Sequence, residues 1–314
     1  MTHQILAYYL FTDIKDPELE VLRHKAFCGS RDIRGRIYIS KDGINGQMSA
    51  SNDDAQAYMA WMQSNSPFEE IEFKLDPYHE HAFEKLIIKH KQQLVALDCP
   101  VDMEKTGVHV EPSEWKEMLT KEDKVLIDVR NDYEWKVGRF EGAETPECAT
   151  FREFREYAEN LKNRIDPRNT PVMMYCTGGI RCEVYSAYLK ERGFKKVYQL
   201  KGGIINYGHK EGSKRWKGKL FVFDDRMTAP ISNEETETIG KCHRCETPTE
   251  AYYNCANMDC NHLFLSCDAC LKELEGCCEE PCKKAPRVRP YHQQNAHKPF
   301  RKWYRYFKGK VKLA

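Results

Sequence analysis

The sequence of 314 residues lacks any apolar run near the length of about eighteen residues that a membrane-spanning helix needs. Its first residues, Met1 to Leu6, show neither the basic nor the apolar segment of a secretory signal peptide. It also lacks an excess of one charge, because 49 Lys and Arg residues nearly balance 48 Asp and Glu residues. We therefore expect a cytoplasmic protein without a membrane partner, in which any basic surface is local.

Cysteine, by contrast, is abundant, with 14 residues in the chain, most of them between Cys242 and Cys282. Disulfides are typical of secreted proteins, so a chain without an export signal is expected to keep reduced thiols or to bind metal. The composition, 41% hydrophobic and 31% charged, is that of a soluble globular protein. The length predicts about two domains.

The most informative stretch runs from Val172 to Glu183. An apolar run ends at Cys176, and a glycine-containing loop then leads into a helical pattern, so Cys176 is expected at the carboxyl end of a buried strand. Amide groups of the loop and the start of the helix would surround the sulfur, and Arg181 adds a positive charge. Such surroundings lower the pKa of a thiol and make it a nucleophile at neutral pH.

The predicted active-site loop consists of the residues that follow Cys176, namely Thr177, Gly178, Gly179, Ile180, Arg181 and Cys182. The two glycines allow the backbone to curl close to the sulfur, because glycine adopts positive φ without penalty. Four residues separate Cys176 from Arg181, fewer than in the phosphatase pattern Cys-x5-Arg, so a phosphatase is disfavoured. Cys182 is expected either to exchange disulfides with Cys176 or to pack under the loop.

The first part of the chain reads as strand, helix, two strands, helix and strand, the order of a ferredoxin-like or acylphosphatase-like α+β domain. Its central feature is a hairpin, in which residues 35–40 and 46–50 flank a turn at Lys41 to Asn45. His24, His79 and His81 are expected to be solvated rather than metal-binding. From Val108 onward, β and α patterns alternate, which predicts a parallel sheet with helices on both faces. Trp216 to Arg226 adds one more strand.

Closely spaced cysteine pairs follow. Four pairs can supply two tetrahedral zinc sites with four thiolates each, and the sites are expected to be structural. The predicted ligands are Cys242, Cys245, Cys255, Cys260, Cys267, Cys270, Cys278 and Cys282. The first pair can combine with the third and the second with the fourth, or consecutive pairs can combine. His243 and His262 are possible substitutes for a cysteine.

Residues 283–314 contain eleven Lys and Arg residues, no acidic residue and many aromatic ones. Cations interleaved with rings suit single-stranded or looped RNA, and a solvated tail is the alternative. The residues expected to bind RNA are Arg301, Lys302, Trp303 and Arg305. The predicted domains are an α+β domain, an α/β catalytic domain, a cysteine-rich segment and a basic aromatic tail, at residues 1–98, 99–226, 227–282 and 283–314.

The loop at Cys176 resembles that of the rhodanese family, with Thr177 in place of the usual arginine. Asp128-Val129-Arg130, Glu134, Gly142-Ala143 and Gly202-Gly203 extend the resemblance. Asp128 and Arg130 are expected to lock loops by hydrogen bonds rather than to take part in chemistry. Arg139 stands where the family has a histidine, so no general base is expected beside the nucleophile.

The combination of a ferredoxin-like domain, a rhodanese domain and a cysteine-rich segment resembles the bacterial tRNA uridine hydroxylase family over nearly the whole chain, including the segment from Lys41 to Gly46. The resemblance implies oxygen-dependent conversion of the wobble uridine of tRNA to 5-hydroxyuridine, with Cys176 as the essential residue. It makes the chain an oxidoreductase with tRNA as partner and molecular oxygen as co-substrate. The sequence shows no motif for an organic cofactor and does not indicate an oligomeric state.

Two other functions remain open. One is sulfur transfer, in which Cys176 carries a persulfide, although Thr177 weakens binding of an anionic sulfur donor. The other is a non-catalytic RNA-binding zinc protein with a vestigial loop. Within the hydroxylase reading, Cys176 either attacks the pyrimidine ring or carries an oxidised sulfur, and the sequence does not choose between these.

Overall fold

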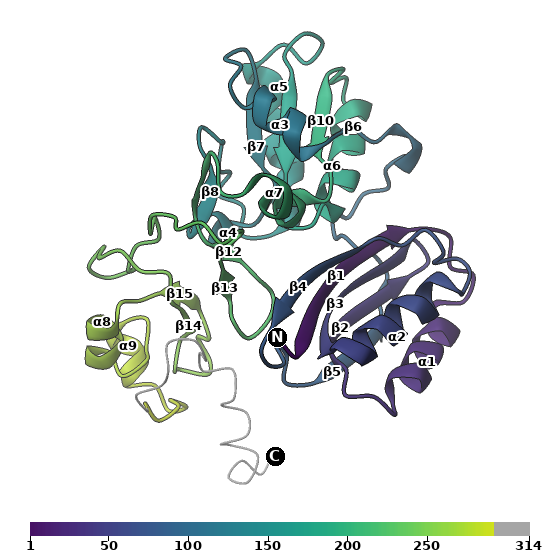
Figure 1. Cartoon of the computed structure of the whole chain (residues 1–314). Coiled ribbons are helices and arrows are strands. Elements are labelled where there is room, and N and C mark those ends of the chain that lie inside the picture. Colours follow the sequence, from purple (N-terminus) through teal and green to yellow (C-terminus); the bar gives the residue numbers. More distant parts are fainter. Residues whose placement is uncertain (292–314) are drawn as a thin grey trace.

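The computed structural model of the chain describes residues 1–291. Three parts are visible in Figure 1: a sheet with two helices, an α/β lobe above it, and a small segment of short strands and helices beside both. Within the described residues, no helix has the length and apolarity needed to cross a bilayer.

The N-terminal part has the α+β architecture that the sequence predicts. Its sheet has the strand order β4-β1-β3-β2-β5, in which β5 runs parallel to β2 and extends the predicted βαββαβ pattern at one edge. The elements, in chain order, are β1 (His3–Phe11), α1 (Pro17–Cys28), β2 (Arg34–Ser40), β3 (Gly43–Ser51), α2 (Asn52–Gln63), β4 (Phe73–Tyr78) and β5 (Leu86–His90).

The two faces of this sheet differ. Helices α1 and α2 cover one face, where Leu6, Ile37, Met48 and Tyr58 form part of a fully buried apolar core. Side chains alternate between the faces of a strand, so Tyr9, Asn45 and their cross-strand neighbours point the other way. That second face lies toward the α/β lobe.

The hairpin is present, but its turn is shorter than expected. β3 already begins at Gly43, so Lys41 and Asp42 alone form the turn and Asn45 lies within the strand. The prediction for the histidines holds for exposed His79. It is wrong for His24, which is fully buried against Trp61 and bonded to Glu20. It is also wrong for His81, whose side chain is only 9% exposed and pairs with Asp32.

The α/β lobe contains the predicted parallel sheet, with strand order β6-β10-β9-β7. Residues of β9 alternate between the two faces: Val172 and Met174 pack against α5 and α6, while Met173 and Tyr175 pack against α3 and α7. The elements are η1 (Met103–Lys105), β6 (Val108–Val110), α3 (Pro112–Met118), β7 (Val125–Asp128), α4 (Asp132–Trp135), β8 (Gly138–Phe140), η2 (Phe151–Glu153), α5 (Phe154–Arg164), β9 (Val172–Tyr175), α6 (Ile180–Glu191), β10 (Val197–Leu200) and α7 (Gly203–Glu211).

The segment after α7 ties the lobe to the N-terminal sheet. The single strand expected at Trp216 to Arg226 is instead two short strands, β11 (Trp216–Gly218) and β12 (Leu220–Phe221), separated because β11 pairs with β8 and β12 with β13 (Thr228–Ala229). Arg226 then forms an ion pair of 2.9 Å with Asp76 on β4. The two lobes are thus bridged close to the sheet face described above.

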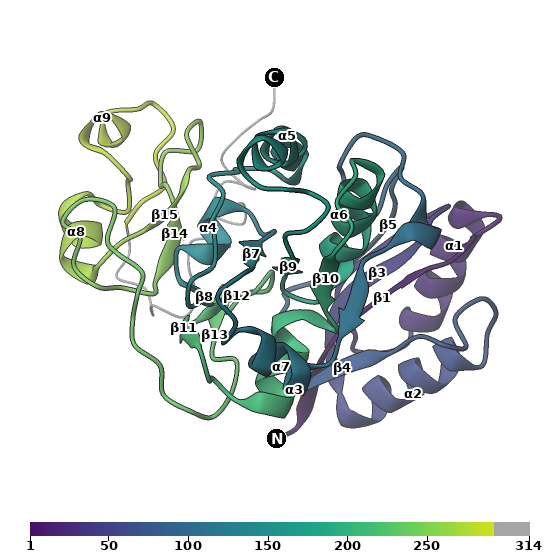
Figure 2. The ribbon, with the colours of Figure 1, turned by 90° about the horizontal axis from the view of Figure 1, so that it is seen from above.

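The cysteine-rich segment is built from small elements around its own apolar cluster, which includes Tyr253, Phe264 and Leu271. Its strands pair with each other and its helices are short. The elements are β14 (Tyr252–Asn254), β15 (Leu263–Leu265), α8 (Asp268–Glu273) and α9 (Glu280–Lys283). Figure 2 shows this segment on the side of the α/β lobe opposite to the N-terminal sheet.

Candidate active site and metal sites

Cys176 follows the last residue of β9, at the carboxyl end of the central strands, as predicted. Its sulfur accepts a hydrogen bond from the amide of Gly179 at 3.1 Å. Burial raises the pKa of the thiol, but hydrogen bonds from Cys182 and the loop amides, together with the charge of Arg181, lower it to about 6. Cys176 is therefore mostly a thiolate at neutral pH, which is the state that acts as a nucleophile.

Cys182 lies in the first turn of α6, and its thiol donates to the Cys176 sulfur. Burial raises the pKa of Cys182, and the neighbouring Cys176 raises it further, so Cys182 keeps its proton. The two residues therefore form a pair of one thiolate and one thiol. Their disulfide exchange stays a prediction.

Two glycines fix the shape of the loop. Gly179 has a φ of 109°, and a Cβ on it would lie 2.7 Å from the hydroxyl of Tyr9. A Cβ on Gly203, at the start of α7, would lie 2.6 Å from the carbonyl oxygen of Cys176. The expectation of positive φ was wrong for Gly178, whose φ is not positive and around which there is free space. Gly178 instead lines the cavity next to Cys176, which is described below.

Arg181 is held by a carboxylate as well as facing the sulfur. Its guanidinium makes two hydrogen bonds to Glu134, one of them 2.8 Å long, and a longer contact of 3.4 Å to the hydroxyl of Thr177. The side chain of Glu134 is fully buried. Breaking such a pair by removing one partner typically costs about 3–5 kcal/mol. Part of the positive charge beside Cys176 is therefore already neutralised, which disfavours binding of an anionic sulfur donor.

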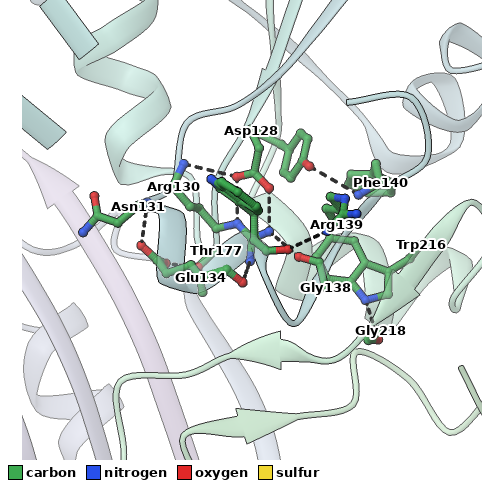
Figure 3. Close-up of polar contacts among 12 residues, drawn as sticks. Asp128, Arg130, Asn131, Glu134, Gly138, Arg139, Phe140, Thr177, Trp216 and Gly218 are labelled. Carbon is green, nitrogen blue, oxygen red and sulfur yellow. Dashed lines mark hydrogen bonds and ion pairs between the residues drawn. The ribbon is translucent and has the colours of Figure 1, made fainter. Parts of the chain in front are cut away.

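Asp128 and Arg130 form a second buried pair beneath the loop (Figure 3). The guanidinium of Arg130 donates two hydrogen bonds to Asp128, of 2.8 and 2.6 Å, and one of 2.6 Å to the carbonyl of Gly138. Both side chains are fully buried, and no contact links them to the sulfur of Cys176. These contacts join the end of β7 to β8, which is the arrangement expected of loop support.

A polar cluster that the sequence did not indicate joins the N-terminal domain to the active-site helix. Glu183 accepts hydrogen bonds from Tyr9 at 2.9 Å and from Gln199 at 3.0 Å, and it contacts His109 at 2.8 Å. The hydrogen bond and charge of Glu183 raise the pKa of His109 despite its burial. Because Tyr9 and Glu183 lie 174 residues apart, no local pattern could have paired them.

Cys176 opens into a cavity of about 350 Å³ between the loop and the second face of the N-terminal sheet. This volume lies at the small end of the range for ligand sites, about 300–1,000 Å³. The N-terminal domain contributes Tyr9, Arg36, Tyr38, Asn45, Gln47 and Lys74 to its wall. Lys74 is half-buried, and burial lowers the pKa of its ammonium against the opposing effect of Cys176. The sequence predicted no cavity residue from this domain.

The eight predicted metal ligands come together in two groups of four, in each of which the sulfur atoms lie within 4.8 Å of one another. The pairing is interleaved, the first of the two alternatives, and neither His243 nor His262 belongs to a group among the described residues. The groups are Cys242, Cys245, Cys267 and Cys270, and Cys255, Cys260, Cys278 and Cys282. Four converging thiols with no open position fit a structural tetrahedral metal site.

The residues predicted to bind RNA, Arg301, Lys302, Trp303 and Arg305, lie outside the described residues.

Comparison with known proteins covers almost the whole chain. Residues 3–94 match the family described as UPF0176 acylphosphatase-like domain, 111–210 the rhodanese-like domain, and 217–283 the rhodanese C-terminal region. These matches fall on the N-terminal sheet, the α/β lobe and the cysteine-rich segment in turn.

Full-length relatives extend the match. A protein of Protochlamydia amoebophila named tRNA uridine(34) hydroxylase is 61% identical over 305 residues, 97% of this chain and 95% of that protein. Proteins of the same name from Chlamydia trachomatis serovar D and Chlamydia felis are 50% and 48% identical, over 95% of this chain and over 91% and 92% of those proteins. Such identity over nearly the full length of each protein shows that the chain belongs to the tRNA uridine(34) hydroxylase family.

Proposed function

We propose that this chain is a tRNA-modifying oxidoreductase that hydroxylates the wobble uridine of tRNA to 5-hydroxyuridine. The observation that carries the proposal is the thiolate of Cys176, which faces a cavity of nucleoside size in a chain that belongs to this family over its whole length. In the reaction, the hydrogen on C5 of uracil is replaced by a hydroxyl group that contains one atom of molecular oxygen. The other atom leaves as water after it takes two electrons and two protons from an external reductant. Cytoplasm, where tRNA is available, is the proposed compartment.

Cys176 is the proposed catalytic residue, and the positive charge of Arg181 stabilises its thiolate. A thiolate can add to an electron-poor carbon of the pyrimidine ring, or it can be oxidised and pass on oxygen from sulfur. Both routes use the same lowered pKa and the same access from the cavity. In both, Thr177 to Cys182 shape the loop, while Asp128 and Arg130 support it from beneath.

The two groups of four cysteines are proposed to hold one structural zinc ion each. Their tetrahedral set of thiolates suits zinc, whose binding would contribute directly to folding of this small segment. The basic aromatic tail at residues 283–314 is proposed to contact tRNA through cations and stacked rings.

The test is mass spectrometry of tRNA nucleosides from three strains: one with the intact chain, one with Cys176→Ser and one without the gene. We expect 5-hydroxyuridine and nucleosides derived from it to vanish in the last two strains. Persistence of 5-hydroxyuridine in a strain without other routes to it would overturn the assignment. Loss of a thiolated nucleoside instead would favour sulfur transfer, and no change at all would favour a non-catalytic RNA-binding protein.

Sulfur transfer is weakened by the loop itself. Rhodanese activity needs a site for an anionic donor such as thiosulfate, and here Glu134 already pairs with Arg181 while Thr177 replaces a second arginine. We expect formation of thiocyanate from thiosulfate and cyanide to be slow. Efficient turnover in that assay would restore the sulfur-transfer function.

A further inference from the structure

The second face of the N-terminal sheet carries polar and aromatic side chains in two rows across neighbouring strands. Tyr9 on β1, Asn45 on β3 and Tyr38 on β2 are direct cross-strand partners and form one row. The second row consists of Lys74 on β4, Ala7 on β1, Gln47 on β3 and Arg36 on β2. Each of these residues is the direct cross-strand partner of the next. Every residue of both rows lines the Cys176 cavity. The face is thus built as one wall of the site.

Two amides in this wall have hydrogen-bonding capacity that the protein leaves unused. Among residues 1–291, no hydrogen bond is made by the side chain of Asn45 or of Gln47, although both are only half-exposed. Because both side chains open on the cavity, water satisfies them in the free protein and a ligand can replace that water. Tyr9, in the same row, is already bonded to Glu183, and Arg36 to the carbonyl of Phe223 at 3.1 Å. The amides are therefore available to a ligand.

A side-chain amide suits the edge of a uracil ring. Its NH₂ group can donate to O4 while its oxygen accepts from N3–H, and two such bonds lie in one plane. Enzymes that act on a base within RNA take it out of the stack and hold it by such edge contacts and by aromatic faces. The tyrosines on either side of Asn45 supply rings, and the cavity of about 350 Å³ has room for one nucleoside but not for a helix.

Lys74 stands at a different place in the wall. A second hollow of about 590 Å³ adjoins the cavity and shares with it the residues Ala7, Gln47, Lys74, Thr177 and Ile205. The cavity at Cys176 is called the first chamber here, and the adjoining hollow the second chamber. Asn45 and Cys176 line only the first chamber. Lys74 makes no ion pair with any described residue, and its Nζ lies 5.2 Å from the ring centre of Tyr9. An unpaired cation between two chambers is suited to the phosphate that joins two nucleotides.

We propose that the first chamber receives a single uracil base extruded from RNA, that Asn45 holds this base by bonding its O4–N3 edge, and that Lys74 binds the adjacent phosphate. This inference rests on the proposed function, since it takes RNA uridine as the substrate class. It assigns recognition of the base to the N-terminal domain and leaves the reacting thiolate in the α/β lobe. Contact with the base and contact with the phosphate thus both come from the N-terminal sheet, at different positions in the wall.

The test uses the full-length chain with Cys176→Ala, which removes chemistry, and measures its equilibrium binding to anticodon stem-loop RNA. Three RNAs differ only at the wobble position, which carries uracil, cytosine or no base. Asn45→Asp leaves acceptors only, so it can donate neither to O4 of uracil nor to N3 of cytosine. We expect the ratio of affinity for the uracil RNA to affinity for the RNA without a base to fall at least about tenfold, the scale of one buried polar contact.

Asn163→Asp, on the exposed side of α5, is the matched control and should leave the ratio unchanged. Lys74→Ala should weaken all three RNAs by a similar factor and reduce the dependence of binding on salt, because a phosphate contact carries no base information. Lys25→Ala, exposed on α1 at the opposite face, controls for loss of one positive charge. A circular dichroism melt of each variant checks folding.

The results separate the inference from the function on which it rests. If Asn45→Asp folds and keeps the parent's ratio of affinity for the uracil RNA to affinity for the RNA without a base, recognition of the base by Asn45 is wrong. If RNA with a uracil binds no better than RNA without a base, extrusion into this chamber is wrong. In both cases the nucleoside analysis of the Cys176→Ser strain still decides whether the chain hydroxylates tRNA.

Discussion

Two regions of this chain use cysteine in opposite ways. At the Cys176 loop one sulfur is surrounded by amides, a thiol and a cation, all from other residues. In the segment from Cys242 to Cys282, four sulfurs face one another in each group. A thiolate stabilised by hydrogen-bond donors has its negative charge compensated by the protein, so it remains available to react with a substrate. Thiolates that converge repel each other and need a cation among them, so they suit a metal rather than a substrate.

The largest expected difference comes from removing one sulfur on the reactive side. Cys176→Ser should lower formation of 5-hydroxyuridine by at least about a thousandfold, the scale on which loss of a catalytic nucleophile acts. Metal content, measured by inductively coupled plasma mass spectrometry, should stay at two equivalents. Cys148→Ser, at another buried cysteine of the same lobe, is the control that should keep activity. A Cys176→Ser protein with near-normal turnover would remove the distinction between the regions.

Removing one sulfur on the metal side should give the reverse pattern. Cys260→Ser takes a ligand from the second group, so about one of two metal equivalents should be lost and the segment should become sensitive to protease. Cys277→Ser is the matched control, because Cys277 is buried beside the group but belongs to neither set. Equal metal content in the two variants would show that the group of four does not hold an ion.

The pH dependence of alkylation should sharpen the comparison within the α/β lobe. The pKa of Cys176 is lowered to about 6, so its reactive thiolate is present above that pH and is lost as the pH falls through it. Burial raises the pKa of Cys148 to about 11, which keeps that residue a thiol at neutral pH. Iodoacetamide labelling followed by peptide mass spectrometry should therefore rise through pH 6 at Cys176 and stay low at Cys148.

Cys182→Ala removes one donor to the sulfur and should move the midpoint at Cys176 upward by roughly one pH unit. Cys99→Ala changes a partly exposed cysteine that neither lines the Cys176 cavity nor affects the pKa of Cys176, and should leave the midpoint in place. A midpoint near 9 in the unchanged protein would contradict the donor arrangement described for the loop.

The smallest effect concerns the hydrogen bond between Tyr9 of the N-terminal domain and Glu183 of the α/β lobe. Tyr9→Phe deletes one hydrogen bond to Glu183 and leaves those from Gln199 and His109 in place. The free energy of unfolding should fall by about 0.5–1.5 kcal/mol, with metal content unchanged. Urea denaturation followed by tryptophan fluorescence measures it. A loss of bound metal in this variant would mean that the two regions are coupled.

The sequence predicted features that depend on residues close together in the chain. Cys176 at the end of a strand, the parallel sheet and the four cysteine pairs follow from local patterns of apolar residues, glycine and cysteine. The turn at Lys41 is shorter than predicted because Asn45 is a polar residue within a strand, where its side chain faces a cavity. His24 was misplaced because a polar residue on a helix gives no sign that Glu20 will bury with it.

What sequence could not supply is contact between distant segments. Glu134 reaches Arg181 across 47 residues, and Tyr9 reaches Glu183 across 174. Lys74 and Asn45 enter the site only because the sheet turns its uncovered face toward the α/β lobe. Such placements depend on how whole domains dock. The side chains of a strand alternate between its two faces in the same way whether a face meets solvent, a helix or an active site, so the pattern does not tell these apart.

The interleaving of the two cysteine groups has a consequence for how the chain is made. Cys255 and Cys260 lie inside the loop that Cys242 and Cys270 close, and their own partners, Cys278 and Cys282, come later. During synthesis the first group is complete only after half of the second has already emerged. The two groups are therefore not successive segments of the chain. A ribosome that stops between Cys270 and Cys282 releases a chain in which the first group has all four ligands and the second lacks at least one. No single cut therefore divides this segment into two pieces that each keep a complete group of four cysteines.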